Sequence, residues 1–193
     1  MTMTAPAPVQ NLQPPSRPAT WQIDPAHSLV EFSVRHMMVS TVKGRFTDVK
    51  GSIAFDPADL SRSSVEVAVG AASITTGDDQ RDAHLRSADF LDVERFPTLT
   101  FTSTRVEPVG ASAQRARIFG QLTLHGVTRE VVLEAELNGS GQTPYGTTVA
   151  GFTAHTTINR KDFDLTWNVA LETGGWLVSD TIKINLEVEA VAA

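Results

Sequence analysis

The stretch that decides the fold is Gln22–Phe55, with the sequence QIDPAHSLVEFSVRHMMVSTVKGRFTDVKGSIAF. Its first part alternates apolar and polar residues, with Phe32 and Val34 in the apolar register. A period of two is typical of a β-strand that buries one face. The second part repeats the pattern around Gly44 and Gly51, and a glycine inside a strand often marks a bulge or a sharp bend. The stretch therefore predicts two paired strands that need further strands around them.

The rest of the chain carries the same pattern with one interruption. Alternation recurs in segments 64–71, 98–106, 117–124, 127–137, 147–158 and 181–191. Segment 75–87 is polar and opens with capping residues, so it predicts one short helix, and Asn138–Gly141 predicts a loop. About eight closely spaced strands predict an all-β fold with antiparallel pairing, because parallel strands would need a helix between every pair. Closure into a barrel is favoured because it removes edge strands.

Length and composition indicate one globular domain. A chain of 193 residues with 41% hydrophobic and 20% charged residues can bury a core without disulfides. Five of the ten prolines lie before residue 21. We therefore expect a disordered proline-rich tail at residues 1–20 and a barrel domain at residues 21–193.

Charge and residue usage exclude several classes of function. A net charge of −6 disfavours binding to nucleic acid and to anionic membrane surfaces. The absence of cysteine excludes disulfides, thiol catalysis and cysteine-ligated zinc. No secretory signal pattern and no apolar run of about 18 residues occurs, so we expect a cytoplasmic protein that meets lipid only from solution.

The residues that could carry chemistry form no convergent set in the sequence. Neither an H-E-x-x-H pair for zinc nor a G-x-S-x-G nucleophile elbow is present. We therefore predict no enzyme activity, no catalytic residues, no metal and no cofactor. Two alternatives stay open. One is a metal protein or hydrolase built around His27, His36 and His84. The other is a stress-related protein with a solid core and functional contacts on its surface, which exposure of Met37 and Met38 in a dimer-sized patch would favour.

Several longer motifs occur in a fixed order along the chain. They are Trp21-x-Ile23-Asp24-x-x-His27-Ser28, Gly44-x-Phe46, Arg81-Asp82-x-His84-Leu85, Phe96-Pro97-x-Leu99-x-Phe101, Gly120-x-Leu122-Thr123-Leu124 and Ile158-Asn159-Arg160-x-Asp162-Phe163. In this order the motifs resemble the YceI-like family, from about residue 21 to residue 188.

The resemblance implies a lipocalin-like extended antiparallel β-barrel that binds a polyisoprenoid, such as a quinone tail or a polyprenyl phosphate, for sequestration or transport. It also implies a homodimer. Many members carry a secretory signal and work in the periplasm, whereas this chain has a proline-rich segment at that place.

The resemblance and the alternation together give the predicted ligand-binding residues. The apolar ones are Phe32, Val34, Met38, Phe46, Val67, Ile74, Leu85, Phe90, Phe101, Leu122, Phe152, Ile158, Phe163, Trp167 and Ile184. Arg81 and His84 are predicted at the mouth of the pocket, with the equal alternative that they anchor the helix to the barrel. Pattern alone favours a solid core for the apolar set, and the resemblance favours a lumen.

Overall fold

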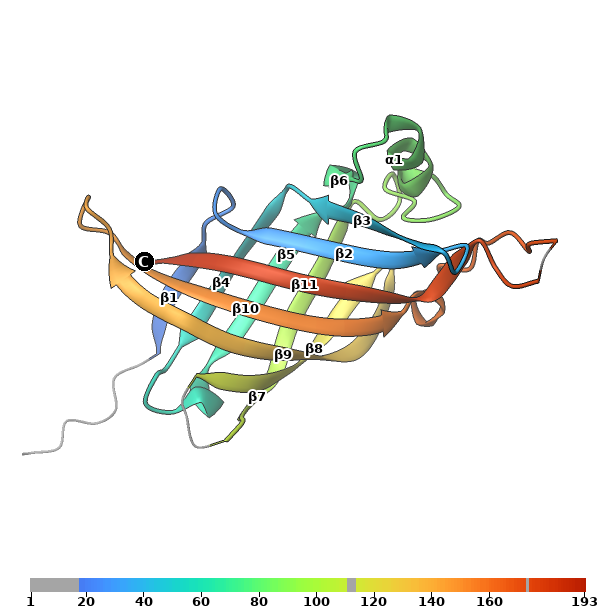
Figure 1. Ribbon diagram of the computed structural model, residues 1–193. Coiled ribbons are helices and arrows are strands. Elements are labelled where there is room, and N and C mark those ends of the chain that lie inside the picture. The colour runs from blue at the N-terminus through green and yellow to red at the C-terminus, as the bar shows by residue number, and fades with distance from the viewer. Residues whose placement is uncertain (1–17, 111–113, 173) are drawn as a thin grey trace, which may run out of the picture.

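A closed ring of antiparallel strands forms the body of the molecule (Figure 1). The computed structural model describes residues 18–110, 114–172 and 174–193. Within these residues, eight strands pair in the order β1-β4-β5-β7-β8-β9-β10-β11, and β11 pairs with β1 to close the ring. The strands are β1 (Ala19–Ile23), β4 (Val49–Phe55), β5 (Ser64–Gly70), β7 (Thr98–Pro108), β8 (Arg115–Leu124), β9 (Val127–Gln142), β10 (Thr148–Asn159) and β11 (Val178–Ala192). The predicted antiparallel barrel is confirmed.

Three more strands extend the sheet from the edge of β11. They are β2 (Leu29–His36), β3 (Ser40–Phe46) and β6 (Ile74–Thr75), in the order β11-β2-β3-β6. The end of β11 pairs with β1, and the preceding part of β11 pairs with β2. Strands β2 and β3 therefore lengthen the wall at one end of the barrel. The opening sequence stretch is predicted as two paired strands, but its second run is divided into β3, which pairs with β2, and β4, which belongs to the closed ring.

The α-helix α1 (Asp79–Arg86) lies beside β6 at this lengthened end (Figure 1). Asp78 is its N-cap, and the Asp78 carboxylate accepts a hydrogen bond from the backbone N–H of Arg81. The short helix predicted within residues 75–87 is therefore confirmed. Short 3-10 turns follow three strands: η1 (Leu60–Arg62), η2 (Ala71–Ser73) and η3 (Arg160–Phe163). Within the described ranges, no helix is both long and apolar enough to cross a membrane.

One expectation about glycine is wrong, and a second, for a bulge or a sharp bend, is wrong as to the bulge. The predicted loop Asn138–Gly141 is part of β9, and the turn follows it, with Gly146 donating to Thr143. The glycines instead permit a register shift in the pairing with β10 next to Gly151. Conversely, no register shift occurs where Gly44 and Gly51 pair with their neighbours.

Both ends of the predicted domain, residues 21 and 193, are within the described residues, whereas the predicted tail mostly is not. Strand β1 begins at Ala19, two residues before the expected start of the barrel. Most of the predicted tail, residues 1–17, lies outside the described residues.

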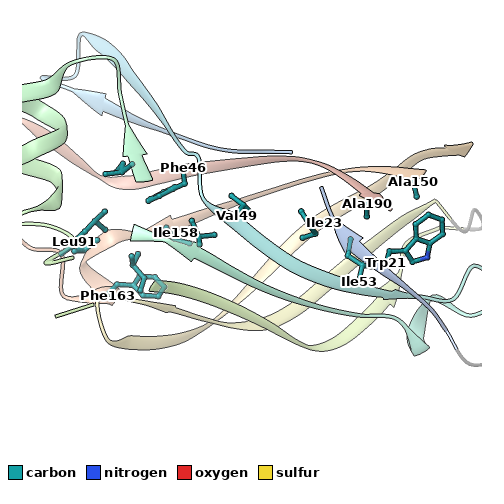
Figure 2. Close-up of a cluster of buried hydrophobic side chains, with 14 residues drawn as sticks. Trp21, Ile23, Phe46, Val49, Ile53, Leu91, Ala150, Ile158, Phe163 and Ala190 are labelled. Atoms are coloured by element: carbon teal, nitrogen blue, oxygen red, sulfur yellow. The ribbon is translucent and has the colours of Figure 1, made fainter. Parts of the chain in front are cut away.

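Buried apolar side chains lie along the length of the barrel, including both of its ends (Figure 2). Trp21, Ala150 and Ala190 lie at the end where β1 closes the ring. Leu91 and Phe163 lie at the end near α1. Between these groups, the side chains that point inward surround a cavity.

Candidate functional site: an apolar lumen

The lumen is a cavity of about 300 Å³ whose lining comes from every strand of the molecule. This volume lies at the lower end of the range of about 300–1,000 Å³ found for small-molecule sites. Representative lining residues are Ile23, Val30, Phe46, Ile53, Val67, Ile74, Phe101, Leu122, Val131, Phe152 and Ile184. The surface offered to a guest is therefore almost wholly aliphatic and aromatic.

Incomplete burial of the inward side chains shows that the barrel is hollow. In a close-packed interior such side chains would be almost fully buried. Instead, Val67, Leu122 and Ile184 are only partly buried although they point inward. The solid-core interpretation does not describe this barrel.

Two glycines leave room for aromatic rings from neighbouring strands that line the lumen. A Cβ placed on Gly44 would meet the ring of Phe32 at 2.4 Å, and a Cβ on Gly120 would meet the ring of Phe101 at the same distance. Each ring therefore occupies the place of the missing side chain on the neighbouring strand. Because the rings lie over glycine, they leave space at the centre of the barrel.

This arrangement predicts opposite effects for two Gly→Ala substitutions in neighbouring strands. Gly120→Ala should displace the Phe101 ring, lowering the free energy of unfolding by about 1–3 kcal/mol through overpacking. Gly141→Ala in β9 is the matched control, because nothing lies within 4 Å of its added Cβ. The control should be neutral or stabilising by up to about 1 kcal/mol. Urea denaturation measures both, and equal changes would contradict the assigned role of Gly120.

Most of the predicted ligand-binding residues border the cavity. Those that do are Phe32, Val34, Phe46, Val67, Ile74, Leu85, Phe90, Phe101, Leu122, Phe152, Ile158 and Ile184. Arg81, His84 and Trp167 border a smaller cavity beside it. Their contact with a ligand stays a prediction.

Two predicted residues lie outside both linings. Met38 is 68% exposed, because β2 ends at His36 and Met38 is in the turn that follows. Phe163 is 1% exposed and packs in the core from η3. Lining residues absent from the prediction include Val65, Val69, Leu99, Ile118, Val131, Ile182 and Val188. These residues could have been predicted from the sequence, since each follows the period-two pattern of its strand.

The smaller cavity, of about 160 Å³, forms a vestibule between α1, β2 and the segment before β11. It shares five lining residues with the lumen: Phe32, Val34, Leu85, Phe90 and Val178. His84 contributes one wall, with ring centroids 5.0 Å from Phe90 and 4.7 Å from Trp167. The vestibule is therefore a second cavity on the side of the lumen nearest to α1, and the five shared residues border both cavities.

Polar side chains at the vestibule fasten the helix to the sheet. Arg81 donates from Nε to Thr76 Oγ1 at 2.7 Å and from Nη2 to the Thr76 carbonyl at 3.2 Å. Asp82 accepts from the Thr76 backbone N–H and hydroxyl. Arg86 donates to the carbonyls of Ala72 and Ile74. These contacts support the interpretation that the Arg81-Asp82 motif anchors α1.

Hydrogen bonds stabilise the charged form of the Asp82 carboxyl. Burial of this carboxyl acts to raise its pKa, but the hydrogen bonds from Thr76 outweigh burial and the pKa is lowered. A lowered folded pKa stabilises the fold above the unfolded value of about 3.9, and the stabilisation is lost as pH falls through the folded pKa.

Asp82→Asn should therefore lower the free energy of unfolding by about 1–3 kcal/mol at neutral pH. A neutral amide oxygen accepts the two hydrogen bonds from Thr76 less strongly than a charged carboxylate does. The difference between variant and wild type should shrink as pH falls below about 4. Thermal denaturation at a series of pH values measures this. A difference that is independent of pH would show that the Asp82 charge is not responsible.

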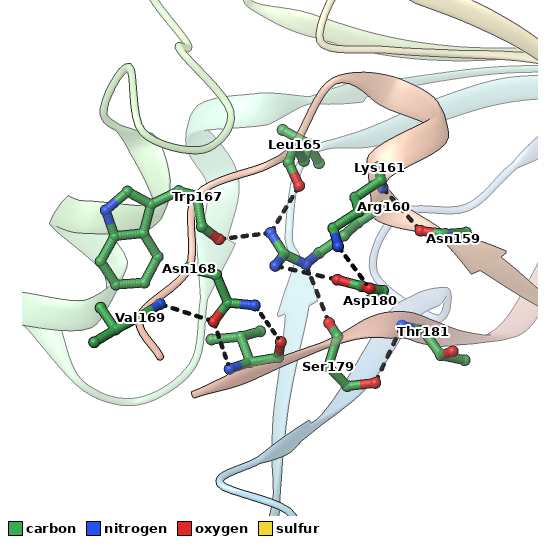
Figure 3. Close-up of polar contacts among 11 residues, drawn as sticks. Asn159, Arg160, Lys161, Leu165, Trp167, Asn168, Val169, Ser179, Asp180 and Thr181 are labelled. Carbon is green, nitrogen blue, oxygen red and sulfur yellow. Dashed lines mark hydrogen bonds and ion pairs between the residues drawn. The ribbon is translucent and has the colours of Figure 1, made fainter. Parts of the chain in front are cut away.

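Arg160 ties the segment after β10 to the start of β11 (Figure 3). Its side chain is 1% exposed. Nη1 donates to the carbonyls of Leu165 at 2.7 Å and Trp167 at 2.8 Å, and Nε donates to the Ser179 carbonyl at 3.1 Å. Burial lowers the pKa of the guanidinium, and Asp180, whose carboxylate is 3.5 Å from Nη2, opposes this effect. Arg160 also borders the lumen, so it holds one end of the lumen in place.

The three histidines of the alternative metal hypothesis are not brought together. In the part of the chain that the structure describes, the set with ligand atoms within 4.8 Å of one another is Asp24, His27 and Glu189. His27 Nδ1 lies 2.8 Å from Asp24, and this hydrogen bond raises the pKa of His27 and lowers that of Asp24. The Asp24 carboxylate also accepts from the Ala26 N–H, so the pair stabilises the turn between β1 and β2.

Comparison with known proteins gives consistent results. The YceI-like domain model matches residues 21–190. A UPF0312 protein of Ectopseudomonas mendocina is 39% identical over 165 residues, covering 86% of this chain and 82% of that protein. The crystal structure of the Campylobacter jejuni YCEI protein aligns with a TM-score of 0.70 at 33% identity, over 82% of this chain and 90% of that one.

A third comparison concerns the fold alone, because the sequence identity is 17%. It is the structure of a polyisoprenoid binding domain from Saccharophagus degradans, with a TM-score of 0.64 over 91% of this chain and 99% of that one. The domain model spans nearly the whole barrel, and the relatives match over most of their length. The chain belongs to the YceI-like family.

Proposed function

We propose that this protein binds a long-chain amphiphile of the polyisoprenoid type in its lumen and carries it without chemical change. The observation that carries the proposal is the continuous apolar lining contributed by every strand. A guest with repeated aliphatic units would match such a lining along its whole length. The name of the Saccharophagus degradans domain supports the same class of ligand.

The expected affinity follows from the burial of the guest. Each buried methylene contributes about 0.8 kcal/mol, so ten contribute about 8 kcal/mol, equivalent to a dissociation constant of about 1 µM. Loss of translational freedom and ordering of the chain reduce this gain. A guest of several isoprene units is therefore favoured over a short one.

Binding is a better proposal than catalysis because three charged or ionisable groups that border the two cavities, Arg81, His84 and Arg160, already have structural partners. Arg81 and Arg160 donate to backbone carbonyls, and His84 bonds to Asp89 at 2.9 Å. These groups close the barrel end and leave the lining apolar.

Pairing into a homodimer is part of the proposal.

Mass spectrometry tests the ligand class directly. Organic extracts of natively purified protein should contain a long-chain isoprenoid or similar amphiphile in an amount comparable to that of the protein. The extract of the denatured and refolded protein provides the control. Equal amounts of lipid in both extracts would contradict specific binding in the lumen.

A further inference from the structure

Exposed apolar side chains gather at one end of the barrel, on two neighbouring loops. Met37, Met38 and Val39 are 44%, 68% and 79% exposed in the turn between β2 and β3. Val169 and Trp176, in the segment before β11, are 46% and 55% exposed. We refer to these five residues as the apolar tip.

Hydrogen bonds join the two loops into one projection. Met37 donates from its backbone N–H to the Leu177 carbonyl at 2.8 Å, and Leu177 donates to the Val169 carbonyl at 2.9 Å. Ala170 forms a β-bridge with Trp176. Figure 1 shows the two loops side by side at the end of the barrel near α1. The apolar tip is therefore one surface.

The backbone at the tip is held in an unfavourable conformation. Met37 and Met38 have φ values of 51° and 61°. A turn with positive φ at both central residues favours Asn-Gly at these positions, because side chains other than glycine are disfavoured there. Met38, which is 68% exposed, lacks most of the packing that would offset this cost, so its position in the fold does not account for its presence.

The tip adjoins the vestibule. His36, Leu177 and Val178 border the vestibule, and His36 and Leu177 directly precede or follow tip residues in the chain. Trp167, two residues before Val169, borders it as well. A surface in contact with the tip would therefore lie next to the vestibule.

Area and residue type favour a bilayer over a protein partner. A stable protein interface buries about 800 Å² on each side, which five side chains on two narrow loops do not provide. Trp176 has the Lys161 ammonium 6.0 Å from its ring, and tryptophan with a long cationic neighbour is typical of the membrane interface. Arg35, which donates to the Met38 carbonyl at 2.8 Å, is a second cation beside the tip.

We infer that the apolar tip inserts into the surface of a lipid bilayer, from which the lumen receives or to which it releases its guest. This inference rests on the proposed function, since such a guest resides in membranes. The net charge of −6 opposes attraction to anionic surfaces. Insertion should therefore depend on apolar contact, occur on zwitterionic lipid and change little with salt.

Vesicle flotation with phosphatidylcholine tests the inference. The double variant Met37→Asn, Met38→Gly gives the turn its favoured residues, so it should fold at least as well as wild type. Its vesicle-bound fraction should fall by about tenfold. Tyr145→Ser is the matched control, because Tyr145 is 95% exposed in the turn between β9 and β10, away from the tip. This variant should bind vesicles as wild type does.

Three results would overturn the inference. The first is that wild type does not float with vesicles, and the second is that the double variant floats as well as wild type. The third is that sedimentation velocity shows wild type as a dimer and the double variant as a monomer. The last would assign the tip to pairing between copies. Binding of detergent-dispersed polyprenol should be unchanged in the double variant. Loss of vesicle binding and loss of lumenal binding are therefore measured separately, so that failure of either proposal is recognised by itself.

Discussion

Val67→Trp is expected to lower the affinity for a long-chain polyprenol by about 100-fold or more while the barrel stays folded. Val67 lies in the middle of β5, paired with Gly51 and Phe101, and its partly buried side chain borders the lumen. An indole at this position would occupy much of a cavity of about 300 Å³. Fluorescence titration with a polyene analogue of the chain measures the effect.

The neighbouring position provides the control for this experiment. Ala68 is in the same strand but on the outer face, where it is exposed. Ala68→Trp adds the same ring to the outside and should bind the polyprenol within about twofold of wild type. If Val67→Trp also bound as wild type, the guest would lie elsewhere and the proposed function would fail.

Arg160→Met should destabilise the fold strongly, lowering the free energy of unfolding by about 3–5 kcal/mol. Methionine preserves an apolar stem, but it leaves the carbonyls of Leu165, Trp167 and Ser179 without their donor. Each buried acceptor left unpaired costs about 1–3 kcal/mol. For a chain of this size, the melting temperature should fall by roughly 6–20 °C.

Lys161→Met is the matched control, because Lys161 is the next residue of η3. Its exposed ammonium pairs with Asp180 at 2.9 Å. Surface pairs of this kind contribute at most about 1 kcal/mol. Chemical denaturation of both variants compares them, and a loss in Arg160→Met no larger than in Lys161→Met would show that the buried hydrogen bonds do not hold this end of the barrel.

The architecture and much of the lining could be predicted because both depend on local periodicity. Phe32 and Val34 in β2 and Ile184 in β11 border the lumen as the period of two requires. The helix could be predicted because Asp78 provides a cap at its start. Register within a strand determines which side chains point inward, and it is visible in the sequence.

Features that depend on contacts between distant segments could not be predicted in this way. Gly120 leaves room for the Phe101 ring, and this contact requires β7 beside β8. Arg160 was visible only as part of a motif, and its role depends on carbonyls from two other segments. Met38 follows the last residue of β2, where the alternation no longer specifies a direction.

A crystal structure of the protein saturated with a polyprenol of defined length would show directly whether the lumen holds the guest. We expect continuous elongated density inside the barrel, in contact with Val67, Leu122 and Ile184. Density confined to the outer surface, with the lumen filled by protein side chains, would contradict a carrier function for the barrel.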